Sequence, residues 1–287
     1  MIAADASRRR PVISAIMPAH NAAPFLEAAV RSIQAQTFGD WELIFVDDGS
    51  DDDTVAIIDA LAANDERIKV TALRHGGRGK ARKECIERAS GTYVAICDSD
   101  DILFPERFEK QLRFLDSHPQ IGVAGAWSIP FDSPTPDPSG HVLRWPTQPA
   151  EIAEAFSRRR MRICNATTMI RAELFRIHGS YDTELRRAQD YEFFARVHRS
   201  GIAFAALPEP LIFYRMASAV PSLAYFTENG MYKAYADLLL DGRAKGFETF
   251  AATPPGRAWR LYLALKYIYF VGKSAAERLR HALSKHR

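Results

Sequence analysis

Hydrophobic and polar residues alternate in short blocks along the first half of the chain. Short apolar runs, rich in β-branched residues, are followed by longer segments whose apolar positions recur at helical spacing. The runs predict five strands, at Val12–Met17, Glu42–Val46, Ile68–Leu73, Tyr93–Cys97 and Ile121–Trp127. The segments between them predict four helices, at Pro24–Gln36, Asp51–Ala63, Gly79–Ala89 and Pro105–Ser117. Such alternation predicts an α/β fold of βαβ units around a mainly parallel sheet.

Two helix starts can be predicted from residue type. Ser50 or Asp51 is the expected N-cap of the second helix, with acidic residues in the first turn, where the helix dipole favours them. Pro105 is expected at the first position of the fourth helix, where a missing amide proton costs nothing.

The regular alternation stops after the fifth strand. Residues Pro130–Pro149 contain six prolines and predict a surface loop. Beyond it the pattern indicates helices at Ala150–Arg160 and Ala172–His178, a strand-like run at Thr167–Ile170, and a mainly helical chain from Tyr225 onward.

The composition is that of an ordinary folded protein. Of the 287 residues, 47% are hydrophobic and 25% are charged, which excludes collagen-like, low-complexity and wholly disordered chains. The three cysteines have no metal-ligand spacing, so we expect free thiols in a reducing compartment. The run Val12–Met17 is too short for a signal-peptide core, and no apolar stretch approaches the length of a membrane span. These features predict a cytoplasmic protein.

Positive charge gathers at the carboxyl end of the chain. From Gly242 onward there are ten Lys or Arg and two Glu, whereas the whole chain has a net charge of only +3. Within this region Trp259–Val271 combines aromatic and aliphatic residues with Arg260 and Lys266, and it is too short to span a bilayer. It could lie on an anionic membrane surface, at the inner face of the membrane, or pack on the protein body.

Polar clusters follow three of the predicted strands. Pro18-Ala19-His20-Asn21 follows the first, Asp47-Asp48 ends the second, and Asp98-Ser99-Asp100 follows the fourth. In an open parallel sheet, ligands bind outside the carboxyl ends of the strands, so these clusters predict one site at that edge.

The Asp98-Ser99-Asp100 step can hold a hard divalent cation, which prefers oxygen ligands and keeps several positions for phosphate and water. A D-x-D step alone is a weak signal, because such aspartates often only cap the next helix. The sequence contains no phosphate-binding G-x-x-x-x-G-K-[ST], no G-x-G-x-x-G after the first strand, no G-x-S-x-G and no H-E-x-x-H.

Taken in order, several segments resemble inverting glycosyltransferases of family 2 with the GT-A fold. The resemblance extends over residues 11 to 216, and its motifs are PAHN (18–21), SIQAQT (32–37), WELIFVDDGSDDDT (41–54), GKARKECIERASGTYVAICDSDD (79–101), AQDYEFFAR (188–196) and PLIFYR (210–215). Each motif is modest, but their order and spacing are specific.

The resemblance implies a nucleotide-sugar site. Asp48 would bond the nucleotide base, and Pro18, His20 and Asn21 would line its pocket. Asp98 would contact the ribose with Ser99 beside it, and Asp100 would bind Mn²⁺ or Mg²⁺ at the diphosphate. Arg82 would contact a phosphate or the base, although it could equally be a surface arginine.

Asp190 matches the catalytic base of the family, although the same carboxylate could instead cap a helix. Two positions depart from the family pattern. His20 stands where Tyr is usual, which would alter stacking on the base. Gln189 stands where Glu is usual, which removes a like charge beside Asp190 and should ease its ionisation.

The predicted organisation is a basic tail over 1–10, a nucleotide-sugar-binding half over 11–127, an acceptor-side half over 128–220 and a helical basic extension over 221–287. The predicted activity is inverting, metal-dependent transfer from a UDP-sugar to a saccharide or lipid-linked acceptor in surface polysaccharide or glycolipid assembly. Because no Q-x-x-R-W motif occurs, transfer should be non-processive. We expect no nucleic-acid partner. The alternatives are a catalytically silent sugar-nucleotide-binding scaffold and, less favoured for want of a phosphate loop, a nucleotidyltransferase.

Overall fold

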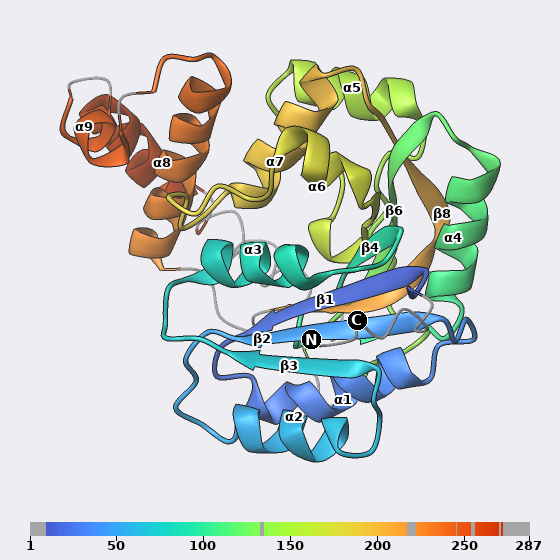
Figure 1. Ribbon diagram of the computed structural model, residues 1–287. Coiled ribbons are helices and arrows are strands. Elements are labelled where there is room, and N and C mark those ends of the chain that lie inside the picture. Colours follow the sequence, from blue (N-terminus) through green and yellow to red (C-terminus); the bar gives the residue numbers. More distant parts are fainter. Residues whose placement is uncertain are drawn as a thin grey trace, which may run out of the picture. The chain divides into compact units, whose positions relative to one another are not determined.

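The computed structural model describes residues 10–132, 135–216, 222–244, 246–253, 256–269 and 271. The chain forms two compact units (Figure 1). The first consists of Met1–Glu184 with Phe193–Met216, and the second of Leu185–Glu192 with Ala217–Arg287. The predicted N-terminal tail before residue 10 and the basic residues after Val271 lie outside the described residues.

The first unit contains an eight-stranded mixed sheet in the order β3-β2-β1-β4-β7-β6-β8-β5. Its parallel half consists of β1 (Ile13–Ala19), β2 (Trp41–Asp47), β3 (Ile68–Ala72) and β4 (Tyr93–Ile96). The other half consists of β5 (Ile102–Leu103), β6 (Ile121–Phe131), β7 (Met169–Arg171) and β8 (Ala203–Arg215). There β7 runs antiparallel to β4 and β6, β6 is parallel to β8, and β5 is antiparallel to β8.

Helices cover both faces of the parallel half. Figure 1 shows α1 (Ala23–Gln34) and α2 (Thr54–Ala62) on one face and α3 (Arg78–Arg88) on the other. The first unit also holds α4 (Arg107–Ser117), α5 (Pro149–Ser157) and α6 (Glu173–His178). Helix α7 (Gln189–Arg199) begins in the second unit and ends in the first. The second unit continues with α8 (Leu223–Leu240), α9 (Phe247–Ala252) and a helix over 256–269.

Burial explains why the first strands read as continuous apolar runs. Every residue of β2 is buried, and β1 is buried at all positions except Pro18, because helices lie against both faces of these strands. Helix α1 supplies Leu26, Val30 and Ile33 from one side to the same core. The predicted α/β fold is confirmed, and the described residues after 221 confirm a helical carboxyl-terminal part.

The second half of the sheet departs from the sequence prediction. The predicted fifth strand continues as β6 to Phe131, four residues beyond Trp127 and into the predicted loop, because Ile129 and Phe131 stay buried beside β8. Strands β5 and β8 were not predicted. The strand-like run at Thr167–Ile170 is a 3₁₀ turn (Asn165–Thr167) followed by β7, which is antiparallel to its neighbours.

Both predicted helix starts are wrong. Helix α2 begins at Thr54, and Asp52 accepts hydrogen bonds from the Thr54 amide at 3.0 Å and from the Thr54 hydroxyl. Ser50 instead donates to Asp47 (Oγ–Oδ1 2.5 Å). Helix α4 begins at Arg107, because the chain before Pro105 pairs with β8 as β5.

A buried arginine joins α4 to the sheet. Arg107 has no exposed surface, and its guanidinium donates to Gln111 Oε1 at 3.0 Å, to the Ile96 carbonyl at 2.9 Å and to the Thr168 carbonyl at 3.2 Å. These carbonyls belong to the last residue of β4 and to the residue before β7, where the sheet changes from parallel to antiparallel pairing. The arginine therefore supplies hydrogen bonds where the two halves of the sheet join.

Replacing Arg107 with Met should destabilise the protein by about 3–5 kcal/mol, because it leaves buried acceptors without donors. Arg113→Met, on the same helix, is the matched control: its side chain is 75% exposed and pairs with Glu109, an interaction worth about 0–1 kcal/mol. Urea unfolding followed by circular dichroism measures both. Equal losses of stability in the two variants would contradict this account.

Candidate functional site

The three predicted polar clusters lie at one edge of the sheet. Strands β1, β2 and β4 are parallel and in register, so their carboxyl ends meet at the same edge. The amide of Asp48 donates to the Ala19 carbonyl at 2.8 Å, and the amide of Cys97 donates to the Ile16 carbonyl at 3.0 Å. Backbone pairing thus brings the segments after these strands together, as the sequence predicted.

Asn21 holds the first loop against the second. Its backbone is left-handed, with φ of +52°, its amide donates to Ser50 Oγ at 2.9 Å, and its Oδ1 accepts from the Asp51 amide at 3.0 Å. The residue was predicted to line the nucleotide pocket. In the structure its side-chain oxygen is bonded to the neighbouring loop, which gives Asn21 a positioning role at the rim.

Asp48 is enclosed by the loop that follows β3. Its Oδ1 accepts from the Gly76 amide at 2.7 Å and its Oδ2 from the Gly77 amide at 2.9 Å. The Asp48 side chain is only 4% exposed. Gly49, with φ of +74°, permits this wrapping, since a Cβ there would lie 2.6 Å from the His75 amide nitrogen. No sequence motif predicted a role for this loop.

Two histidines lie over Asp48. His75 Nδ1 is 2.9 Å from the Asp48 carbonyl oxygen and 3.1 Å from Asp48 Oδ2. The ring of His20, which follows β1, lies against that of His75 with centroids 4.5 Å apart and planes inclined by 35°. Both rings are exposed, and Pro18 beside them is half-buried. His20 and Pro18 therefore lie at the same end of the parallel strands as Asp48.

The residues Asp98–Asp101 form a turn that concentrates negative charge. Asp98 is 30% exposed, Ser99 and Asp100 are half-buried, and Asp101 is only 1% exposed. Burial, followed by repulsion from Asp98, raises the pKa of Asp100. Burial and repulsion from both neighbours raise the pKa of Asp101 well above its usual range. Such a turn favours binding of a cation.

Strand β8 holds this turn in place through hydrogen bonds from Arg215. The amide of Arg215 donates to Asp101 Oδ1 at 2.7 Å, and Arg215 Nε donates to the Asp100 carbonyl at 3.0 Å. The guanidinium of Arg215 also lies over the rings of Phe25 (4.4 Å) and Phe131 (4.2 Å). Asp101 and Arg215 lie in motifs that resemble the family, yet no role was predicted for either, because β8 was not predicted.

Arg82 is buried rather than a surface arginine. It lies on α3 with 4% of its surface exposed, and its Nη2 is 3.4 Å from Asp98 Oδ1. Its guanidinium is 5.7 Å from the centre of the Tyr181 ring. The structure thus places a permanent positive charge beside the carboxylate turn.

Asp190 lies in the first turn of α7, within the second unit, whereas the residues described above belong to the first unit. Asp190 is half-buried, and its Oδ1 accepts from the Tyr191 amide at 2.8 Å. It lies inside the helix and is not its N-cap. Tyr191 continues the helix, and its hydroxyl donates to Asp237 Oδ1 of α8 at 2.5 Å.

The carboxylates at the turn fit a divalent cation that takes only some of its ligands from the protein. Among the residues that the structure describes, no three His, Cys, Asp or Glu side chains come together as a metal cage. Asp98 and Asp100 offer carboxylate oxygens. Mg²⁺ and similar cations usually take one or two carboxylates and complete their shell with phosphate oxygens and water.

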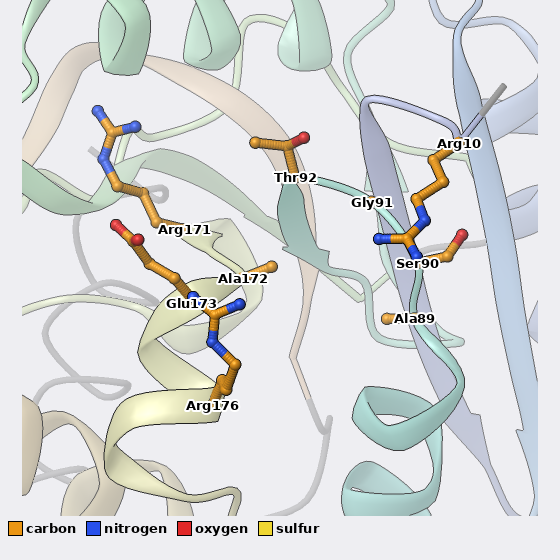
Figure 2. A pocket seen from close by; sticks show the side chains of 9 residues that line it. All are labelled: Arg10, Ala89, Ser90, Gly91, Thr92, Arg171, Ala172, Glu173 and Arg176. Carbon is orange, nitrogen blue, oxygen red and sulfur yellow. The ribbon is translucent and has the colours of Figure 1, made fainter.

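A hollow of about 640 Å³ lies at the opposite edge of the parallel strands. Figure 2 shows Arg10 and Ser90 on one side of it and Arg171, Glu173 and Arg176 on the other. The guanidinium of Arg171 already donates hydrogen bonds to the carbonyls of Ile121 at 2.9 Å and Leu115 at 2.7 Å. This hollow contains none of the predicted site residues.

Residues 14–177, more than half of the chain, match the family model described as "Glycosyl transferase family 2". The chain belongs to glycosyltransferase family 2. The match includes both aspartate clusters and ends before Asp190.

Among similar proteins, the glycosyltransferase EpsE of Bacillus subtilis is 32% identical over 205 residues, which cover 70% of this chain and 72% of EpsE. The amylovoran biosynthesis glycosyltransferase AmsE of Erwinia amylovora is 30% identical over 194 residues, covering 67% of this chain and 71% of AmsE. Both relatives are named as glycosyltransferases, and AmsE as one of amylovoran biosynthesis.

Solved structures share the fold. TarS 1–349 of S. aureus in complex with UDP-GlcNAc aligns with a TM-score of 0.62 at 23% identity, over 79% of this chain and 66% of that chain. The mannosyltransferase PcManGT of Pyrobaculum calidifontis with GDP-Man and Mn²⁺ aligns with a TM-score of 0.60 at 16% identity, over 96% of this chain and 80% of that chain. The family-2 chain thus has the GT-A fold and spans a little under two thirds of the TarS fragment.

All three cysteines are free thiols, as predicted. Within the described part of the chain, no helix combines the length and the apolar character needed to cross a bilayer.

Proposed function

We propose that this glycosyltransferase moves a sugar from a UDP-sugar to an acceptor hydroxyl, with inversion at the anomeric carbon and without processivity. The acceptor is a saccharide or a lipid-linked saccharide of surface polysaccharide or glycolipid assembly. One observation carries the proposal: in a family-2 chain, a turn of three carboxylates lies at the carboxyl edge of parallel strands, the same edge at which the rings of His20 and His75 lie near Asp48.

The donor side belongs to the proposed nucleotide-sugar-binding half, residues 11–127. Pro18, His20 and Asn21 shape the base pocket with Asp48 beneath it. Asp98 and Ser99 contact the ribose, and Arg82 adds positive charge beside Asp98 (Nη2–Oδ1 3.4 Å). Asp100 would hold Mn²⁺ or Mg²⁺, and the bound cation would supply Lewis-acid stabilisation of charge on the departing diphosphate.

The acceptor side belongs to the proposed half over 128–220, which contains Asp190. Asp190 removes the proton from the acceptor hydroxyl, and the oxygen forms a bond to the anomeric carbon. The bond from that carbon to the diphosphate breaks on the opposite face, and the electron pair leaves with the nucleoside diphosphate. One displacement inverts the configuration. Gln189, which is neutral, adds no competing charge next to the base.

The catalytically silent scaffold would be favoured by the loss of Asp100 or of Asp190. Both residues are present, so the enzyme is preferred. A nucleotidyltransferase is not favoured either, since the segment after β1 provides Pro18-Ala19-His20-Asn21 instead of a glycine- and lysine-rich phosphate loop.

The helix over 256–269 has two different sides. Leu263 is 5% exposed and packs at Gly230 of α8, and Tyr267 contacts Phe226. The other side leaves Leu261, Leu265 and Ile268 between 60% and 66% exposed. We propose that this apolar side, with the basic residues that follow in the sequence, attaches the 221–287 extension peripherally to an anionic membrane at its cytoplasmic face.

Asp100→Ala should remove the Mn²⁺-dependent part of UDP binding and abolish turnover while the fold is kept, because it deletes the carboxylate proposed to hold the cation. Calorimetric titration with UDP, with and without Mn²⁺, measures this. Asp53→Ala is the matched control, since Asp53 is exposed near the same rim and its side chain makes no capping hydrogen bond. Unchanged Mn²⁺ dependence in Asp100→Ala would show that the metal assignment is wrong.

Asp190→Asn should lower kcat by about 10²–10⁴-fold with little change in donor affinity, since a general base acts in the transition state. The variant keeps an Oδ1 acceptor for the Tyr191 amide, so α7 should begin as before. Single-turnover kinetics with the acceptor, together with the dissociation constant for UDP, separate the two effects. A rate near that of the wild type would place the base elsewhere.

The triple variant Leu261→Ser, Leu265→Ser, Ile268→Ser should lose co-sedimentation with vesicles that contain phosphatidylglycerol. The three side chains are exposed, so the fold should be unaffected. Ile177→Ser is the control, because it removes an equally exposed apolar side chain (62%) from the first unit. If the wild type fails to bind these vesicles at low salt, or the triple variant binds equally well, the membrane proposal is rejected.

A further inference from the structure

We infer that His75 determines which nucleobase the protein accepts, and that the buried Asp48 acts through it. The inference rests on the proposed function, because it takes the base to bind at the carboxyl edge of β1 and β2. No motif of the sequence pointed to His75. Three features of His75 support it: the anchoring of its loop, the proton on its ring, and the surface that it shares with His20.

The loop that carries His75 is fixed at several atoms. The amide of Leu73 donates to the Asp47 carbonyl at 2.8 Å, and the amides of Gly76 and Gly77 donate to the two carboxylate oxygens of Asp48. Gly49 approaches the backbone of His75 so closely that a Cβ would collide with it. The backbone of His75 is thus held by the strand end at which the base is proposed to bind.

The contacts of the ring assign its proton. Nδ1 faces the Asp48 carbonyl oxygen at 2.9 Å and Asp48 Oδ2 at 3.1 Å, and both oxygens are acceptors. Nδ1 therefore carries hydrogen, and in the neutral ring Nε2 is left as an acceptor. A fixed acceptor on a fixed ring can distinguish bases by the donors on their edges, and a site that bonds a particular group rejects analogues that lack it.

The carboxylate of Asp48 is poorly placed to contact the base directly. The Asp48 side chain is 4% exposed, whereas that of His75 is 62% exposed. A ligand approaching this part of the rim meets the imidazoles before the carboxylate. His20 lies against His75 with 4.5 Å between ring centroids, so the two rings present a continuous aromatic surface. Bases stack on such surfaces, whereas hydrogen bonds at their edges provide the selectivity.

Titration calorimetry with three probes tests the inference: UDP, GDP and inorganic pyrophosphate, each with Mn²⁺. His75→Ala should weaken UDP binding by roughly 5- to 150-fold, the range expected for losing one stacking ring. Pyrophosphate has no base, so its affinity should be unchanged. The ratio of the UDP and GDP affinities should move toward one. His141→Ala, an exposed histidine on the segment before α5, is the control.

His75→Phe separates stacking from hydrogen bonding. It keeps an aromatic ring but has neither Nδ1–H nor Nε2, so overall nucleotide affinity should recover to within a few-fold of the wild type while the UDP-to-GDP ratio does not. His20→Ala combined with His75→Ala should lose less than the sum of the single variants, because each ring supports the other.

The outcomes distinguish this inference from the proposed function. If the wild type binds neither UDP nor GDP, the proposed function and the role of His75 are both rejected. If the wild type binds and His75→Ala leaves both the affinity and the ratio unchanged, only the role of His75 is rejected. Equal weakening of UDP and pyrophosphate would assign His75 a purely structural role and would also overturn the inference.

Discussion

Burial of neighbouring carboxylates within the Asp98–Asp101 turn, with the repulsion between them, is the constraint on which the site depends. Three carboxylates fall within four residues, and burial with repulsion raises the pKa values of Asp100 and Asp101. The surrounding elements supply positive charge and hydrogen-bond donors that stabilise the carboxylates. Helix α3 contributes Arg82 beside Asp98, α4 places the buried Arg107 where its charge stabilises ionised Asp101, and β8 gives the Arg215 amide to Asp101 Oδ1. A divalent cation would complete this compensation from the solvent side.

A second, smaller constraint shapes the part of the site where the base is proposed to bind. The buried carboxylate of Asp48 needs hydrogen-bond donors, and the loop after β3 provides them from Gly76 and Gly77. This wrapping brings His75 to the rim and leaves Asp48 covered. The same interaction thus stabilises a buried charge and creates the exposed surface that a nucleotide would meet. This interaction explains why Asp48, the residue that matches the family pattern, is covered, whereas His75 is exposed.

The sequence was most informative where a pattern is local. β1 to β4 and their helices were located to within a few residues, since buried parallel strands are short apolar runs and their helices have regular apolar spacing. The positions of Asp48, Asp98 and Asp100 at strand ends followed from the same pattern. β8 was missed because it contains Pro208 and Pro210 and pairs with strands distant in sequence. The roles of Arg107, Arg215 and His75 depend on contacts that no local pattern encodes.

The most direct test of the central claim is the anomalous scattering from Mn²⁺ in crystals of the protein grown with UDP. The account predicts one strong peak within coordination distance of an Asp100 carboxylate oxygen and of the UDP diphosphate, with uracil against the rings of His20 and His75. A Mn²⁺ peak away from the Asp98–Asp101 turn, or UDP bound in the arginine-lined hollow at the opposite edge of the sheet, would contradict it.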